Sequence, residues 1–147
     1  MKRLFLGLIC ALLTTLASAQ SNPVQFGYTY KVDTGIQGKQ VYITGQRPFN
    51  EKGELVGAGD LSAQIRQVYE NVKTALGKVG LTLRDVKQVT YHLKGEPGQV
   101  SALANQQILQ SNTIYFPDGA PKLSELKNIP KIIRDDVLIE VEVIASK

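Results

Sequence analysis

The hydrophobic pattern is most regular between residues 61 and 79. Apolar residues recur there at spacings of three and four, which places one set on a single helix face: Ile65, Val68, Val72, Leu76 and Val79. Asp60 stands at the N-cap position, and Gly80 stands where a helix would stop. We predict an amphipathic helix over residues 61–79 that packs on a sheet, because strand patterns flank it on both sides.

Alternating or continuous apolar runs predict five strands, at residues 25–32, 39–44, 86–94, 122–129 and 137–144. A weaker stripe predicts a second helix at residues 100–112. In strand 86–94 the apolar face carries Val89, Tyr91 and Leu93 (together with Lys87), and His92 lies on the wetter face. Glu125 and Lys127 indicate that strand 122–129 is an edge strand or faces solvent.

The order β-β-α-β-α-β-β predicts an α+β domain in which two helices cover one face of a mixed sheet. Residues 20–147 are expected to form this single domain, which is long enough to bury a core. The other face of the sheet still needs cover, and apolar residues left on it argue for an oligomer.

Residues 1–19 have the pattern of a cleaved signal peptide. Lys2 and Arg3 precede an apolar run that is short for a membrane span, and Ala17-Ser18-Ala19 forms a small-x-small cleavage site. We expect cleavage after Ala19 and a periplasmic or secreted protein without a membrane anchor. An uncleaved anchor is the alternative.

Once residues 1–19 are removed, the composition of the remaining chain excludes several kinds of functional site. Cys10 is the only cysteine and leaves with it, so neither a disulfide nor a thiolate nucleophile is expected. His92 is the only histidine, which argues against a histidine-based zinc site or a Ser-His-Asp triad. The remaining 15 basic residues nearly balance 13 acidic ones, so nothing predicts a nucleic-acid partner. We predict no metal and no cofactor.

Several segments together resemble the Rid family (RidA, also called YjgF or L-PSP). They are residues 41–46 (VYITGQ), 53–56 (GELV), 64–73 (QIRQVYENVK), 86–93 (VKQVTYHL) and 139–145 (IEVEVIA). The resemblance implies a chorismate-mutase-like fold and a homotrimer with sites in the clefts between subunits. It also implies hydrolysis of 2-iminobutanoate or 2-iminopropanoate, the reaction of an imine or enamine deaminase acting on a C–N bond.

The resemblance also implies site residues. Glu140 corresponds to the glutamate that places or activates water, and Thr44 and Gly45 correspond to the Ser-Gly of the family's Ser-Gly-Gln motif. Tyr30 or Tyr28 corresponds to a pocket tyrosine, Asn105 to the asparagine of the second helix, and Ser124 to a residue that is often cysteine.

The family's carboxylate-binding arginine is not carried over, because its Pro-Ala-Arg reads Ala120-Pro121-Lys122 here. Lysine keeps the charge and loses the planar fork, so Lys122 is expected to hold a small anionic ligand less firmly.

Plainer interpretations stay open for these residues. In the plainer interpretation, Glu140 is an ordinary solvent-facing glutamate on the polar side of an alternating strand. Lys122 is then an exposed lysine that protects an edge strand against pairing. A non-catalytic ligand-binding module of the same fold is therefore the alternative function. Endoribonuclease activity ranks last, because the chain has no pair of histidines.

Overall fold

The structure, a computed structural model, describes residues 28–31 and 40–147 of the chain. Its elements follow the predicted order, with one 3₁₀ turn added: β1 (Tyr28–Lys31), β2 (Gln40–Gln46), α1 (Leu61–Gly77), η1 (Leu83–Asp85), β3 (Val86–Lys94), α2 (Ala102–Tyr115), β4 (Lys122–Ile129) and β5 (Ile139–Ser146).

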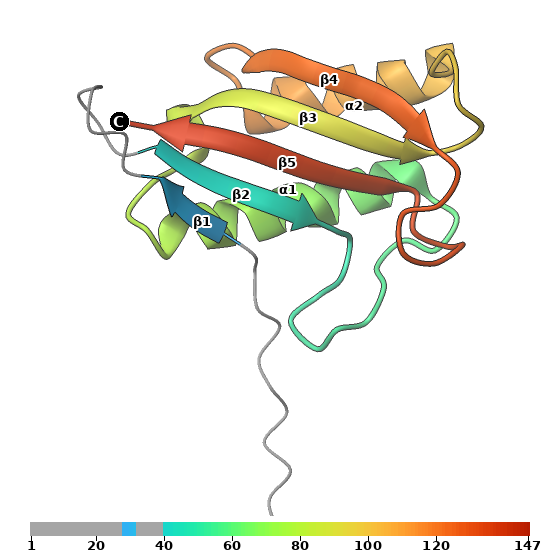
Figure 1. The fold of residues 1–147 in the computed structure, drawn as a ribbon, viewed down its shortest axis with the longest axis horizontal. Coiled ribbons are helices and arrows are strands. Elements are labelled where there is room, and N and C mark those ends of the chain that lie inside the picture. Colours follow the sequence, from blue (N-terminus) through green and yellow to red (C-terminus); the bar gives the residue numbers. More distant parts are fainter. Residues whose placement is uncertain (1–27, 32–39) are drawn as a thin grey trace, which may run out of the picture.

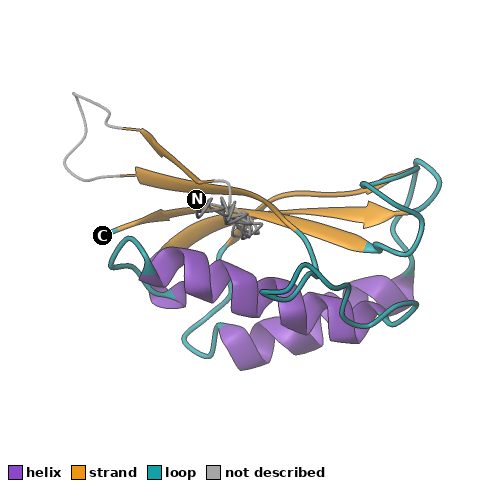
Figure 2. Ribbon diagram, turned by 90° about the horizontal axis from the view of Figure 1, so that it is seen from below, coloured by secondary structure: helices purple, strands orange, loops and turns teal. Residues whose placement is uncertain are grey.

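The five strands form one sheet in the order β1-β2-β5-β3-β4. Only β3 and β4 are parallel to each other, and the other neighbours are antiparallel. The last strand is thus central, and β4 is an edge strand, one of the two predicted alternatives (Figure 1). Both helices lie on one side of the sheet (Figure 2), which confirms the predicted α+β architecture.

Helix α1 buries the predicted face, since Ile65, Val68, Val72 and Leu76 are inaccessible to solvent. Asp60 caps it by accepting a hydrogen bond from the Ala63 amide. The helix ends at Gly77 rather than at residue 79. The amides of Val79 and Gly80 bond three residues back, and Gly80 turns the chain with a φ of 73°. The last predicted turn is therefore wound more tightly than an α-helix.

The bounds of α2 and β5 also differ from the predictions. Ser101 caps α2, which starts two residues later than predicted. The helix continues to Tyr115 because Tyr115 packs on Tyr69 with ring centroids 4.7 Å apart. Strand β5 starts at Ile139, because the amide of Val137 bonds in a turn to Arg134 and not to a neighbouring strand.

A small polar cluster joins the sheet to both helices inside the apolar core. Tyr69 of α1 lies 2.7 Å from the Tyr91 hydroxyl of β3 and donates to the side-chain oxygen of Asn112 in α2. Burial raises the pKa of Tyr69 and that of Tyr91. The two tyrosine hydroxyls and the side-chain oxygen of Asn112 are thus hydrogen-bonded to one another.

The face of the sheet opposite the helices is called the open face below. It carries Thr90 and His92 of β3 and Glu140 and Glu142 of β5, whereas Val86, before the irregularity in the β3–β5 pairing, lies in the core. Val89, Tyr91 and Leu93 of β3 point into the core as predicted, whereas Lys87 is exposed beside an irregularity in the pairing with β5. No other element of the described chain covers the open face.

The predicted signal peptide, residues 1–19, lies outside the described residues. Within the part of the chain that is described, no helix has both the length and the apolar character needed to cross a membrane.

Candidate functional site

Glu140 is the buried acid of the open face. It pairs with His92 across the β3–β5 ladder, near the start of the central strand. Although no layer of the described chain lies over this face, only 9% of Glu140 is exposed. A carboxylate this poorly hydrated needs polar partners, and these come from two neighbouring strands.

Arg47 is the first of these partners. Its Nε–H donates to Oε2 of Glu140 at 2.6 Å, which makes a close ion pair. Arg47 lies just past the end of β2, and its backbone carbonyl accepts a hydrogen bond from the side-chain amide of Asn71 in α1. The guanidinium therefore extends from a backbone that is anchored to the helix layer.

Gly45 lies beside this ion pair at the irregular end of β2. Its φ of 59° is in the left-handed region, which favours glycine, and the pairing of β2 with β5 shifts register here. A Cβ at this position would lie 3.7 Å from Oε2 of Glu140 and 3.9 Å from a terminal nitrogen of Arg47. The glycine thus lets the backbone bend beside the two charged groups.

His92 is the second partner of Glu140. Its Nδ1 lies 3.5 Å from Oε1 of Glu140, and its Nε2 lies 3.4 Å from Oε2 of Glu125 on β4. Lys127 in turn lies 2.9 Å from the same oxygen of Glu125. Hydrogen bonding to Lys127, and then to His92, lowers the pKa of Glu125. Charged and polar groups therefore form one row across the sheet, from Arg47 to Lys127.

Two residues of this row, together with Glu142, have the donor types of a cation site. His92, Glu140 and Glu142 each offer a ligand atom, and these atoms lie within 4.8 Å of one another. Imidazole and carboxylate groups suit several divalent metals. Arg47 already holds one oxygen of Glu140, so a metal ion would have to share that carboxylate with the guanidinium.

A hollow of about 220 Å³ lies on the open face, beside this row. Thr44 and Ser124 both line it, so the structure brings these two predicted site residues together. The Ser124 hydroxyl donates to the side-chain oxygen of Gln88 at 2.8 Å. Glu142 also lines the hollow, and it lies about 7 Å along β5 from Glu140 on the same face.

Three predicted site residues lie elsewhere in the chain. Lys122 pairs with Gln88, four residues along β3 from the partner of Glu140, which separates the two by about 13 Å along the strand. Tyr30 pairs with Val41 in the β1–β2 hairpin, as predicted, and its side chain is outside the described part of the structure. Asn105 is exposed in the first turns of α2, on the helix side of the sheet.

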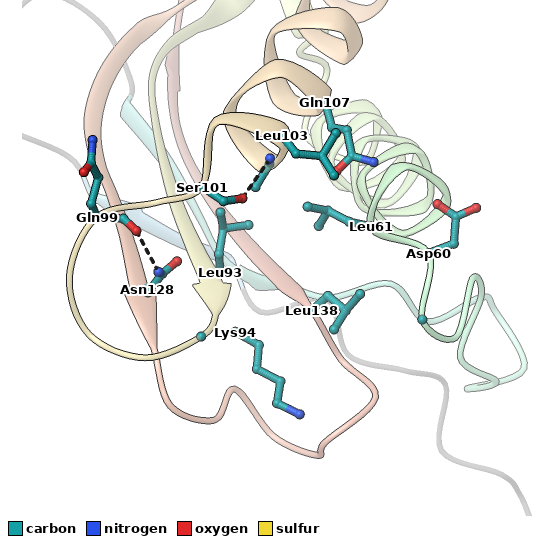
Figure 3. A pocket seen from close by; sticks show the side chains of 13 residues that line it. Asp60, Leu61, Leu93, Lys94, Gln99, Ser101, Leu103, Gln107, Asn128 and Leu138 are labelled. Carbon is teal, nitrogen blue, oxygen red and sulfur yellow. Dashed lines mark hydrogen bonds between the residues drawn. The ribbon is translucent and has the colours of Figure 1, made fainter.

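A second hollow, of about 580 Å³, lies between the first turns of α1 and α2 and the end of β3 (Figure 3). None of the predicted site residues lines it. The caps Asp60 and Ser101 already accept from amides of their own helices, and the Lys94 amine is bound by Asp135. Its polar groups are thus largely satisfied within the chain, and Glu140 remains the better centre for a site.

Sequence reasoning missed Arg47, and it placed His92 on the wetter face of its strand without assigning it to the site. Both have a recognisable signal: Arg47 directly follows the Thr44-Gly45-Gln46 motif, and His92 lies in the wetter row of β3. What the sequence did not reveal is the register that sets both beside Glu140.

The chain is similar to known proteins over most of its length. The family model described as endoribonuclease L-PSP matches residues 25–147. A RutC family protein of Pyrococcus horikoshii is 38% identical over 113 residues, covering 75% of this chain and 81% of that protein. A 2-iminobutanoate/2-iminopropanoate deaminase of Salmonella typhimurium is 34% identical over 133 residues, covering 88% of this chain and 95% of the deaminase.

The fold is shared as well. The crystal structure of Escherichia coli TdcF with bound serine is 26% identical, with a TM-score of 0.60 over 79% of this chain and 84% of that one. A family match over residues 25–147 and relatives above 30% identity lead to the same conclusion. This chain belongs to the endoribonuclease L-PSP family, which includes the RutC and Rid proteins.

Proposed function

We propose that this chain hydrolyses a small 2-imino acid to the 2-keto acid and ammonia, at a site on the open face around Glu140. The observation that carries the proposal is the burial of Glu140 beside Gly45 on a face that no described element covers. Membership of a family with relatives named 2-iminobutanoate/2-iminopropanoate deaminase supports this reaction.

Hydrolysis of the imine requires one acid–base group close to the C=N bond. Water adds to the carbon of the C=N bond while Glu140 accepts a proton from the water. Glu140 returns this proton to the nitrogen, which gives a carbinolamine. It then takes the proton of the new hydroxyl group and delivers it to the amino nitrogen as the C–N bond breaks and the carbonyl forms. One imine and one water thus give one keto acid and one ammonia. Oε1 of Glu140 faces His92 and Oε2 is held by Arg47, so the carboxylate is fixed in orientation.

Two further features belong to the proposal. We infer a homotrimer with its sites in the clefts between subunits, because the open face exposes a polar row and a hollow that a neighbouring subunit would cover. Light scattering tests this, and a monomeric mass would remove the inter-subunit site. We also infer export through the signal peptide at residues 1–19, which intact-mass measurement of the secreted protein checks directly.

A non-catalytic binding function is the second candidate. It is favoured by the separation between Lys122 and Glu140, because a three-carbon acid is too short to reach both side chains of one protomer. In that case the hollow lined by Thr44 and Ser124 would bind a small molecule that is not turned over. Ligand-dependent thermal stabilisation without product release is its signature.

Ammonia release from freshly generated 2-iminopropanoate tests the proposed reaction. We expect turnover above the spontaneous rate, and a drop in kcat of about a hundredfold or more in Glu140→Gln, since Gln cannot accept the proton. Glu70→Gln, an exposed glutamate in the helix layer, is the matched control. A Lys122→Arg variant runs beside them. Turnover by this variant alone would mean that the natural ligand differs from 2-iminopropanoate, and no turnover by any protein would favour the binding function.

A further inference from the structure

We propose that Arg47 is the residue of this site that binds the carboxylate of the ligand, in place of the lysine at position 122. The inference rests on the proposed function, because it assumes a small carboxylate-bearing ligand next to Glu140. It assigns the binding of that carboxylate to a side chain just past the end of β2, at a position different from the one that the family resemblance indicates.

The guanidinium of Arg47 has unused donors at the right place. Nε is engaged by Glu140, and among the described residues neither terminal nitrogen has a hydrogen-bond partner. The side chain as a whole is 36% exposed. A guanidinium carries five N–H groups in one plane, and its two terminal nitrogens form a fork that matches the two oxygens of a carboxylate.

Arg47 is also held in place on its backbone side. The Asn71 side chain donates to the carbonyls of both Arg47 and Phe49, at 2.8 and 2.9 Å. Pro48, between them, is fully buried, and its carbonyl accepts from the amide of Val56. The ion pair with Glu140 fixes the other end of the side chain. Little conformational freedom is therefore lost when a ligand binds to the guanidinium.

The competing cations are engaged elsewhere or too far away. Lys127 is bound to Glu125, and Lys94 contacts the backbone carbonyl and the carboxylate of Asp135. Lys122 lies about 13 Å along the sheet from the row of Glu140. Of the lysine and arginine residues in the described structure, Arg47 alone forms an ion pair with Glu140. A ligand bound by Arg47 would thus lie within reach of the acid–base group.

The test is a binding titration of the purified protein with pyruvate, a stable 2-keto acid, and with methyl pyruvate, which lacks the carboxylate. Arg47→Gln alone would leave a buried carboxylate unpaired, so the decisive comparison is made in a Glu140→Gln background. We expect Arg47→Gln/Glu140→Gln to bind pyruvate at least about tenfold more weakly than Glu140→Gln does, with the preference over methyl pyruvate abolished. Lys122→Gln/Glu140→Gln and Arg66→Gln/Glu140→Gln are the controls.

An Arg47→Lys variant gives the same comparison in the wild-type background. It keeps the charge and a partner for Glu140, yet loses the fork, so a similar tenfold loss is expected. A purely structural role for Arg47 would leave the preference for pyruvate over methyl pyruvate unchanged in this variant.

The outcomes separate the inference from the function on which it rests. If removal of Lys122 weakens pyruvate binding and both Arg47 changes leave it intact, the inference is overturned and the proposed function stands with Lys122 as the anion-binding residue. If the wild-type protein shows no preference for pyruvate over methyl pyruvate, the proposed function and the inference both fall.

Discussion

The Nε of Arg47 and Oε2 of Glu140 meet at 2.6 Å although 93 positions separate the two residues in the chain. The ion pair favours both groups, because the buried carboxylate gains a charged partner and the arginine side chain is held in one orientation. A double-mutant cycle with Arg47→Gln, Glu140→Gln and the double variant should give a coupling free energy of about 1 kcal/mol, since the exposed part of Arg47 is screened by solvent.

Urea unfolding measures this coupling. Arg47→Gln alone should destabilise the protein more than the double change, because it leaves Glu140 buried without a counter-charge. A loss in the double variant equal to the sum of the two single losses would show that the ion pair contributes nothing to stability.

Gly45 should tolerate no side chain without cost. Its φ of 59° makes Gly45→Ala strained, and we expect a loss of about 1 kcal/mol in the free energy of unfolding. The bend also aligns Arg47 with Glu140, so turnover should fall together with stability. Gly77→Ala is the matched control, because Gly77 lies in α1 and an added Cβ would meet no atom within 4 Å. That change should be neutral or stabilising, by up to about 1 kcal/mol.

Gln64 should be among the most sensitive polar residues in the helix layer. Its buried side chain donates to the carbonyls of Gly57 and Asp136 and accepts from the Leu138 amide. Gln64→Leu should cost about 3 kcal/mol or more, because these backbone groups lose partners in a buried site. Gln106→Leu, at an exposed position of α2, should change the free energy of unfolding by less than about 0.5 kcal/mol. Similar values for both variants in thermal or urea unfolding would contradict this role.

The buried tyrosine pair predicts sensitivity to alkali. Burial raises the pKa of Tyr69, so the folded state keeps a proton that the unfolded chain loses above about pH 10. The stabilising contribution is complete below that pH and declines as the pH rises further, by up to about 1.4 kcal/mol per pH unit for each tyrosine. Tyr69→Phe should flatten the decline measured by urea unfolding between about pH 9 and 11. A slope identical to that of the wild type would rule out Tyr69 as its source.

The fold follows closely from the hydrophobic pattern of the sequence. The periodicity of α1 and the alternation in β3 identified buried faces correctly, because burial of apolar area dominates where an element faces the core. The ends of α1, α2 and β5 were each misplaced by two or three residues. Capping, tight turns and the stacking of Tyr115 on Tyr69 decide those ends, and single-residue contacts of this kind leave no periodic signal.

By itself, the sequence determined the order of the elements, the buried faces of α1 and β3, and the family. The tertiary structure alone decided which polar side chains meet. Register placed His92 opposite Glu140, a shift in pairing at the end of β2 placed Arg47 beside the same carboxylate, and Lys122 fell about 13 Å away along the sheet. The physical reason is that strand pairing joins residues that are far apart in the chain. The buried apolar residues set the register, and the register then determines which polar residues meet on the open face.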